Sequence, residues 1–203
     1  MSSTIRASAI CILFKQMKFR LLYGLAAVSL LLSCQSNSFQ INGYARAFQE
    51  GDTVCLITES PDQALLAQTV IRDGKFQFTG ETDSIMLCRT YVKHEPDCGV
   101  VFFLESGNIT VEINPQPDFS RVSGTIINNE WQQLADSVQL LANDIFLILK
   151  KPAKDSLTQV LQTHTVDSLH RRMSDCILHT AQRNSDNPLG QYIKKYYKKP
   201  EFK

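Results

Sequence analysis

The spacing of apolar residues changes near Thr125, and this change limits the folds open to the chain more than any other feature. Apolar residues beyond it recur at intervals of three and four: Trp131, Leu134, Val138, Leu141, Ile145 and Ile148. That spacing predicts one apolar stripe along a helix. Before Thr125 the apolar segments are short and separated by turn residues, which is typical of strands. The sequence therefore predicts an α+β protein with its strands first.

Eight short segments of the first part have the composition and length of strands. Phe78 and its neighbours in Lys75–Thr79 alternate apolar with polar, as expected of a strand with one wet face. Arg72-Asp73-Gly74 and Glu105-Ser106-Gly107-Asn108 are turn signals because glycine tolerates a positive φ. The predicted strands are Phe39–Tyr44, Thr53–Thr58, Leu65–Ile71, Lys75–Thr79, Ile85–Val92, Gly99–Leu104, Asn108–Ile113 and Arg121–Ser123. We expect an antiparallel β sandwich or a partly closed barrel over residues 39–125.

Residues 126–203 are predicted to form a helical region, built as a helical hairpin. The first helix ends at Lys150-Lys151-Pro152, because proline disfavours helical geometry in the residue before it. A second helix is expected from Ser156 to Arg183, with Asp155 as its N-cap. Asn187-Pro188 is typical of the cap and first residue of a short third helix.

The first 33 residues are predicted to be a signal peptide of the lipoprotein type. The apolar run LLYGLAAVSLLLS at residues 21–33 follows Lys15, Lys18 and Arg20, and is short for a membrane span. The run ends in Leu-Leu-Ser-Cys, which resembles the lipobox of bacterial lipoproteins. By that resemblance Cys34 is acylated and becomes the mature N-terminus, and residues 34–38 form a lipidated tether. The alternative is a plain signal peptide or membrane helix that happens to contain a cysteine.

The distribution of charge along the chain limits the kinds of partner that it can bind. The whole chain has a net charge of +1, but residues 1–33 contribute +4 and the tail Lys194–Lys203 contributes another +4. The body between them is mildly acidic, which argues against a nucleic-acid partner because binding phosphates requires a basic face. The tail could contact anionic lipid or a partner, or it could simply complement a helix dipole.

Several stretches of the mature chain are similar to the motifs of one family. They are Phe39–Gly43, the turn-containing Asp73–Gly80, Phe103–Ile109 with its Phe-x-Glu-x-Gly pattern, Val122–Asn128 with Gly-Thr-x-x-Asn, and Asn187–Tyr192. The chain resembles the domain of unknown function that precedes a thioredoxin-like domain in lipoproteins of Bacteroidota. In that family a thioredoxin fold with a Trp-Cys-x-x-Cys motif normally follows. No Cys-x-x-Cys occurs in this chain, so the resemblance implies the accessory half without its redox activity.

Four cysteines remain once Cys34 is lipidated and the signal removed: Cys55, Cys88, Cys98 and Cys176. An oxidising compartment permits two disulfides among them, and the pair flanking residues 93–97 is the obvious candidate. A hairpin closing at Val92 and Gly99 places Cys88 opposite Phe103, however, so a bridge to Cys98 needs a register slip or a bulge. We favour unpaired structural thiols, because a core of this size does not depend on disulfides.

The candidate binding residues are His94, Glu95 and Asp97, which we expect at a hairpin tip where binding residues concentrate. An ordinary polar loop is the alternative. The other histidines, His164, His170 and His179, lack the spacing of a metal site and are interpreted as solvated. No phosphate loop, nucleophile elbow or other catalytic motif is found in the sequence, and no metal or other cofactor is expected.

Two functions compete at this point. The first is a non-catalytic, lipid-anchored binding or interaction module of the cell envelope, on the outer membrane and facing the periplasm, with a thioredoxin-like envelope protein as a possible partner. The polar Gln35–Ser38 after Cys34 carries no acidic residue, which favours the periplasmic side. The second is a thiol-based redox enzyme, or a fragment of one whose thioredoxin domain is missing, that uses Cys88 or Cys98.

Overall fold

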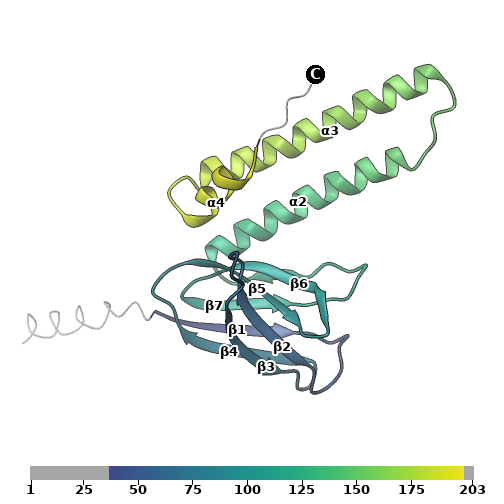
Figure 1. Cartoon of the computed structure of the whole chain (residues 1–203). Coiled ribbons are helices and arrows are strands. Elements are labelled where there is room, and N and C mark those ends of the chain that lie inside the picture. The colour runs from purple at the N-terminus through teal and green to yellow at the C-terminus, as the bar shows by residue number, and fades with distance from the viewer. Residues whose placement is uncertain (1–36, 199–203) are drawn as a thin grey trace, which may run out of the picture. The chain divides into compact units, whose positions relative to one another are not determined.

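The structure is a computed structural model that describes residues 37–198 (Figure 1). The predicted signal segment 1–33, the lipidation site Cys34 and the last five residues of the basic tail lie outside the described residues. Within residues 37–198, no helix combines the length and the apolar character that crossing a bilayer requires.

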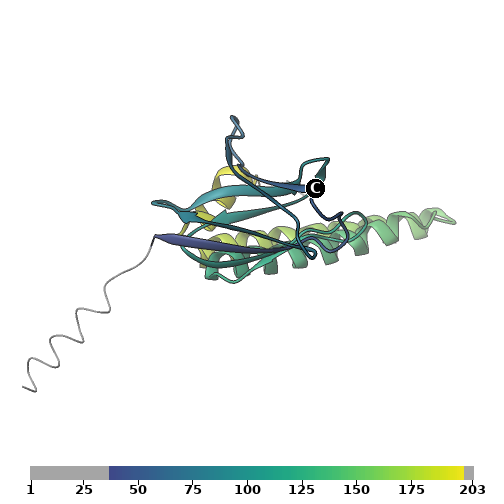
Figure 2. The ribbon, with the colours of Figure 1, turned by 90° about the horizontal axis from the view of Figure 1, so that it is seen from below.

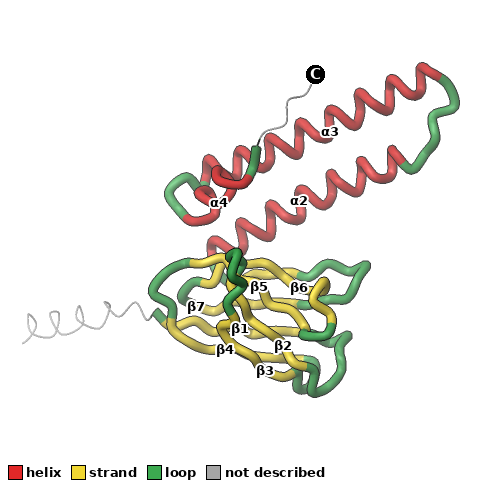
Figure 3. Tube along the Cα trace, in the orientation of Figure 1, coloured by secondary structure: helices red, strands yellow, loops and turns green. Residues whose placement is uncertain are grey.

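Residues 38–123 form eight strands in two four-stranded sheets, followed by three helices (Figure 3). The strands are β1 (Ser38–Tyr44), β2 (Thr53–Thr58), β3 (Leu65–Val70), β4 (Lys75–Glu81), β5 (Met86–Val92), β6 (Glu95–Leu104), β7 (Gly107–Glu112) and β8 (Arg121–Ser123). One sheet has the order β4-β1-β7-β8 and the other β3-β2-β5-β6. The predicted α+β class with strands first is confirmed, as a two-sheet arrangement rather than a closed barrel.

The first sheet is mixed, which corrects the expectation of an antiparallel sandwich. β1 pairs with β4 antiparallel but with β7 parallel, in a register that sets Ile41 beside Ile109. A parallel pair cannot be joined by a hairpin and needs a crossover connection. Here the connection runs through β2 to β6: the chain forms β2 and β3 of the second sheet, returns to pair with β1 as β4, and completes the second sheet with β5 and β6 before β7 lies parallel to β1.

The predicted turn at Arg72-Asp73-Gly74 is present, but it joins the two sheets rather than two strands of one sheet. Asp73 and Gly74 have φ of 51° and 67°, the backbone that a tight two-residue turn demands. β3, before the turn, pairs with β2, whereas β4, after it, pairs with β1. The turn is therefore a corner between the two sheets.

The core lies between the two sheets. The alternation predicted for β4 is confirmed, since Phe76 and Phe78 are buried and the residues between and beside them are exposed or half-buried. Ile41 of β1, Leu56 of β2 and Phe102 of β6 are fully buried in the same cluster. Apolar side chains from both sheets thus meet in one core, as expected of a sandwich.

The helices begin and end close to where the sequence predicts. They are α2 (Ile126–Leu149), α3 (Ser156–Arg183) and α4 (Pro188–Tyr196). Asp155 caps α3 by accepting a hydrogen bond of 2.7 Å from the Thr158 amide, and Asn187 caps α4 in the same way. In the hairpin of α2 and α3, Leu141 and Ile145 pack against Leu169.

The first turns of α2 hydrogen-bond to the outer edge of β6, the last strand of its sheet. The Phe103 amide donates to Asn128 Oδ1 at 2.8 Å, and Asn128 Nδ2 donates to the Phe103 carbonyl at 2.8 Å. One turn later, the Trp131 indole N–H donates to the Val101 carbonyl at 2.8 Å. A helix thereby supplies the partners that a neighbouring strand would otherwise supply.

The same turns also reach β8, the edge strand of the other sheet. Gln132 Oε1 accepts a hydrogen bond of 2.8 Å from the Val122 amide, and Asn129 Oδ1 accepts one of 3.0 Å from Gly124. Since edge strands with unpaired backbone groups invite aggregation, these bonds protect the sandwich on the side where β6 and β8 end the two sheets.

We predict that Asn128→Ala lowers the free energy of unfolding by about 2–4 kcal/mol, because it leaves the buried Phe103 amide and carbonyl without partners. Asn143→Ala is the matched control, since Asn143 is an exposed amide on the same helix, and we expect a change within about 0.5 kcal/mol. Urea unfolding measures both variants. A loss no larger for Asn128→Ala than for the control would contradict the structural role of this amide.

Candidate functional site

The β5–β6 hairpin that carries His94, Glu95 and Asp97 differs from its predicted register. Tyr91 pairs with Gly99 and Val92 pairs with Glu95, so the hairpin does not close at Val92 and Gly99. A β-bulge of residues 96–98 accounts for the difference, and it moves Cys88 opposite Phe102 instead of Phe103. A Cβ on Gly99 would lie 2.8 Å from the Thr90 carbonyl oxygen, so the backbone beside the bulge requires glycine.

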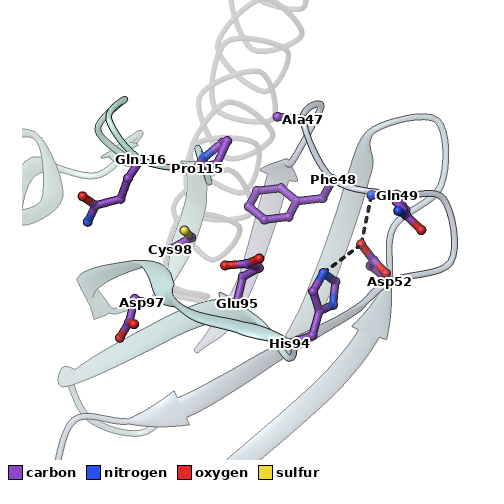
Figure 4. A pocket seen from close by; sticks show the side chains of 10 residues that line it. All are labelled: Ala47, Phe48, Gln49, Asp52, His94, Glu95, Asp97, Cys98, Pro115 and Gln116. Carbon is purple, nitrogen blue, oxygen red and sulfur yellow. Dashed lines mark hydrogen bonds and ion pairs between the residues drawn. The ribbon is translucent and has the colours of Figure 1, made fainter.

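His94 lies at the hairpin tip as predicted, whereas Glu95 and Asp97 belong to β6. These three residues line an open cleft of about 960 Å³ at one end of the sandwich (Figure 4). The walls come from three connections: the loop between β1 and β2, the β5–β6 hairpin, and the loop between β7 and β8. The lining residues are Ala47, Phe48, Gln49, Asp52, His94, Glu95, Asp97, Cys98, Pro115 and Gln116.

A contact between a histidine and a carboxylate joins the hairpin tip to the β1–β2 loop across this cleft. His94 Nε2 lies 3.6 Å from Asp52 Oδ2, and the Gln49 amide donates to the same oxygen at 2.9 Å. The Asp52 side chain is 18% exposed and the His94 side chain 54%. Asp52 is thus held in place by its own loop, while the imidazole at the tip remains accessible to solvent.

The remaining cleft residues combine acidic groups with one aromatic ring. The Glu95 carboxylate points toward the ring of Phe48, whereas the Asp97 side chain points the other way (Figure 4). Carboxylates beside an aromatic face can hold an ammonium or guanidinium group by charge and by cation–π attraction. This arrangement is therefore suited to binding a positively charged group.

The four cysteines of the described part are free thiols, and Cys55, Cys88 and Cys98 are buried. Burial and, to a smaller extent, the nearby Glu59 carboxylate raise the pKa of Cys88 to about 12. Nucleophilic exchange requires the thiolate. Cys88 is therefore protonated and unreactive near neutral pH. Cys98 lines the cleft but is only 7% exposed.

The α3 histidines lie apart from the cleft. His179 lines a shallow hollow between α2 and α3 together with Asp175 and Cys176. Among residues 37–198, no three His, Cys, Asp or Glu side chains come together in a way that could hold a metal ion.

Sequence reasoning missed the half of the cleft that comes from other connections, in particular Phe48, Asp52 and Gln116. These residues carry no motif, and they meet the hairpin only because their connections lie at the same end of the sandwich. One sequence signal could have pointed to Asp52: Gly51-Asp52 stands just before β2, which indicates a tight connection at the end of a strand.

We predict that iodoacetamide leaves Cys88 unmodified in the folded protein at pH 8, because its raised pKa keeps the thiol protonated. Half-buried Cys176 is the internal comparison, and we expect it to react first. Mass spectrometry of peptides after timed labelling separates the two sites, and denaturation should remove the difference. Rapid alkylation of Cys88 in the native state would show a thiolate that this environment does not support.

Residues 39–131 match a family model described as "Domain of unknown function (DUF4369)". The match covers all but the first residue of the sandwich and continues into α2 as far as Trp131, so it includes the helical turns that hydrogen-bond to β6. Neither the curated proteins nor the solved structures contain a match to this chain. The segment 39–131 is thus similar to a family of unknown function.

Proposed function

We propose that the protein is a non-catalytic binding or interaction module, anchored by lipid at Cys34 to the outer membrane and facing the periplasm. Its binding site is the cleft between the β1–β2 loop, the β5–β6 hairpin and the β7–β8 loop. The observation that carries the proposal is the cleft itself, which gathers His94, Glu95 and Asp97 with Phe48 and Asp52. The partner is an envelope protein such as a thioredoxin-like protein.

The direction of β1 supports this arrangement. β1 begins at Ser38, four residues after the proposed anchor, and the loop that follows its other end carries Phe48 and Asp52. A seven-residue strand spans roughly 23 Å. The cleft therefore lies at the opposite end of β1 from the point where the tether would join the domain, and this end is open to a partner.

The charge of the cleft supports a partner that presents a basic residue. Asp52, Glu95 and Asp97 supply three carboxylates, and Asp52 also pairs with His94. A lysine or arginine entering beside Phe48 would meet a carboxylate and the face of the ring. We therefore expect a basic segment of the partner to occupy the cleft.

The alternative is a thiol-based redox enzyme, or a fragment of one, and the observation in its favour is that Cys98 lines the cleft. Cys98 is only 7% exposed, whereas thiol–disulfide exchange requires a sulfur that the substrate disulfide can reach. An insulin-reduction assay with dithiothreitol separates the two functions. Catalysis that disappears in Cys98→Ala would establish the enzyme and overturn the binding module.

The anchor is tested by metabolic labelling with a palmitate analogue. We expect wild-type protein to be labelled and to fractionate with the outer membrane, and Cys34→Ala to lose both properties because no acyl acceptor remains. Cys176→Ala is the control, since this half-buried cysteine belongs to the helical hairpin. Labelling that persists in Cys34→Ala would refute the lipid anchor.

The cleft is tested by site-specific photo-crosslinking in intact cells. A photoreactive residue in place of His94 should capture one periplasmic partner, whereas the same residue in place of Ser84, an exposed position in the loop after β4, should not. The adduct should weaken when Glu95→Gln is added, because the partner's basic group loses its carboxylate. Equal capture from both positions, or none from His94, would exclude the cleft as the binding site.

A further inference from the structure

Helix α2 carries a second apolar stripe beside the one that packs on α3. Its members are Ala135, Val138, Ala142, Phe146 and Leu149, which follow one another at intervals of three and four residues. At 100° per residue this spacing keeps them on one side of the helix. Phe146 is 62% exposed and Leu149 is 66% exposed. A helix that only had to pack on α3 would need one stripe.

Near the sandwich, the second stripe forms one wall of an apolar groove. The groove has a volume of about 310 Å³ and lies among α2, α3 and α4. Ala135 and Val138 line it from α2, and Tyr192 and Tyr196 line it from α4. Farther along the hairpin, the two helices extend past α4 (Figures 1 and 2), and there the stripe projects Phe146 and Leu149 instead.

One side of a single helix thus presents a hollow near one end and two large apolar side chains near the other. Two such helices lying antiparallel about a two-fold axis place the projecting side chains of each in the hollow of the other. With the axis at Ala142, Phe146 of one copy lies opposite Val138 of the other, because both are four residues from Ala142. The small Ala142 side chain allows the helices to approach closely there.

We propose that this face is a homodimer interface, in which α2 packs antiparallel against α2 of a second copy and Phe146 inserts into the groove beside Val138. This interface is separate from the cleft and does not depend on the proposed function.

The exposed area fits a second copy. Phe146, Leu149 and Tyr196 are each 61–66% exposed, and together with the half-buried members of the groove they leave roughly 400 Å² of apolar surface in water. Interfaces are about 60% apolar. A symmetric pair would therefore bury about 1,300 Å² in all, at the lower end of stable interfaces. We expect a dimer of modest affinity.

Charge argues for a second copy over a lipid surface. The stripe itself contains no charged residue. The ammonium groups of Lys150 and Lys195 lie 5.9 and 5.0 Å from the ring centroids of Phe146 and Tyr196, and a second copy displaces these long side chains into solvent. Lys150, Lys151 and Lys154 lie beyond Phe146 at the end of the hairpin. If the hairpin entered a bilayer end first, these ammonium groups would be the deepest part of it, which is costly.

The test is disulfide crosslinking of the full-length chain in the cells that express it. Ala142→Cys should form a disulfide-linked dimer on mild oxidation, because the two copies of residue 142 face each other across the axis within bonding distance. Leu140→Cys is the matched control: residue 140 is 66% exposed, but two positions along a helix it lies about 200° away. It should give no dimer above the wild-type background.

Adding Phe146→Ala to Ala142→Cys should weaken dimerisation about tenfold, as expected for an aromatic side chain buried at an interface. A photoreactive phenylalanine analogue in place of Phe146 is a second readout, and it should capture another copy of the same chain. Equal dimer from both cysteine variants, or no dimer from Ala142→Cys, would overturn the proposal. So would adducts formed only with a different protein.

Discussion

The contact between the first turns of α2 and the outer edges of β6 and β8 is the interaction on which the rest of the structure depends. The side chains of Asn128 and Trp131 form hydrogen bonds with backbone groups of β6. The side chain of Gln132 accepts a hydrogen bond from the backbone of β8, and that of Asn129 accepts one from Gly124, just after β8. Phe103 then packs edge-on against Trp131 and against Tyr192 of α4, with ring centroids 5.9 and 6.2 Å apart. The junction is therefore both hydrogen-bonded and packed, and it joins the sandwich to the helices.

This junction and the cleft lie on different parts of the sandwich. The junction stabilises the strand edges, and the cleft offers a surface for binding. The edges of β6 and β8 are taken up by α2, while the connections at one end remain free to form the walls around His94 and Asp52. Loops on a rigid scaffold can carry binding residues without weakening the core. The helical hairpin, which extends past α4, presents a third surface, where Phe146 and Leu149 are exposed.

Much of the fold could be predicted from the sequence, because hydrophobic period and capping act locally. The helix from Ser156 to Arg183 and the strands at Thr53–Thr58 and Arg121–Ser123 have the expected bounds. Pairing could not be predicted in the same way: the parallel β1–β7 pair joins residues far apart in the chain, and the bulge at residues 96–98 changes the register of Cys88. In the site, the hairpin tip at His94 was predicted, whereas its partner Asp52 depends on tertiary structure. The role of Asn128 was visible only as part of a Gly-Thr-x-x-Asn pattern, without its physical reason.

Native-state hydrogen exchange of the Phe103 and Val122 amides tests the central claim most directly. Both amides point out of their sheets to side chains of α2, so protection at these two positions reports the junction alone. The account predicts that both exchange as slowly as amides inside the sheets, by unfolding of the whole sandwich. Exchange as fast as that of amides on the open edges of β3 and β4, at the opposite sides of the two sheets, would show that α2 does not hold these edges and would contradict the account.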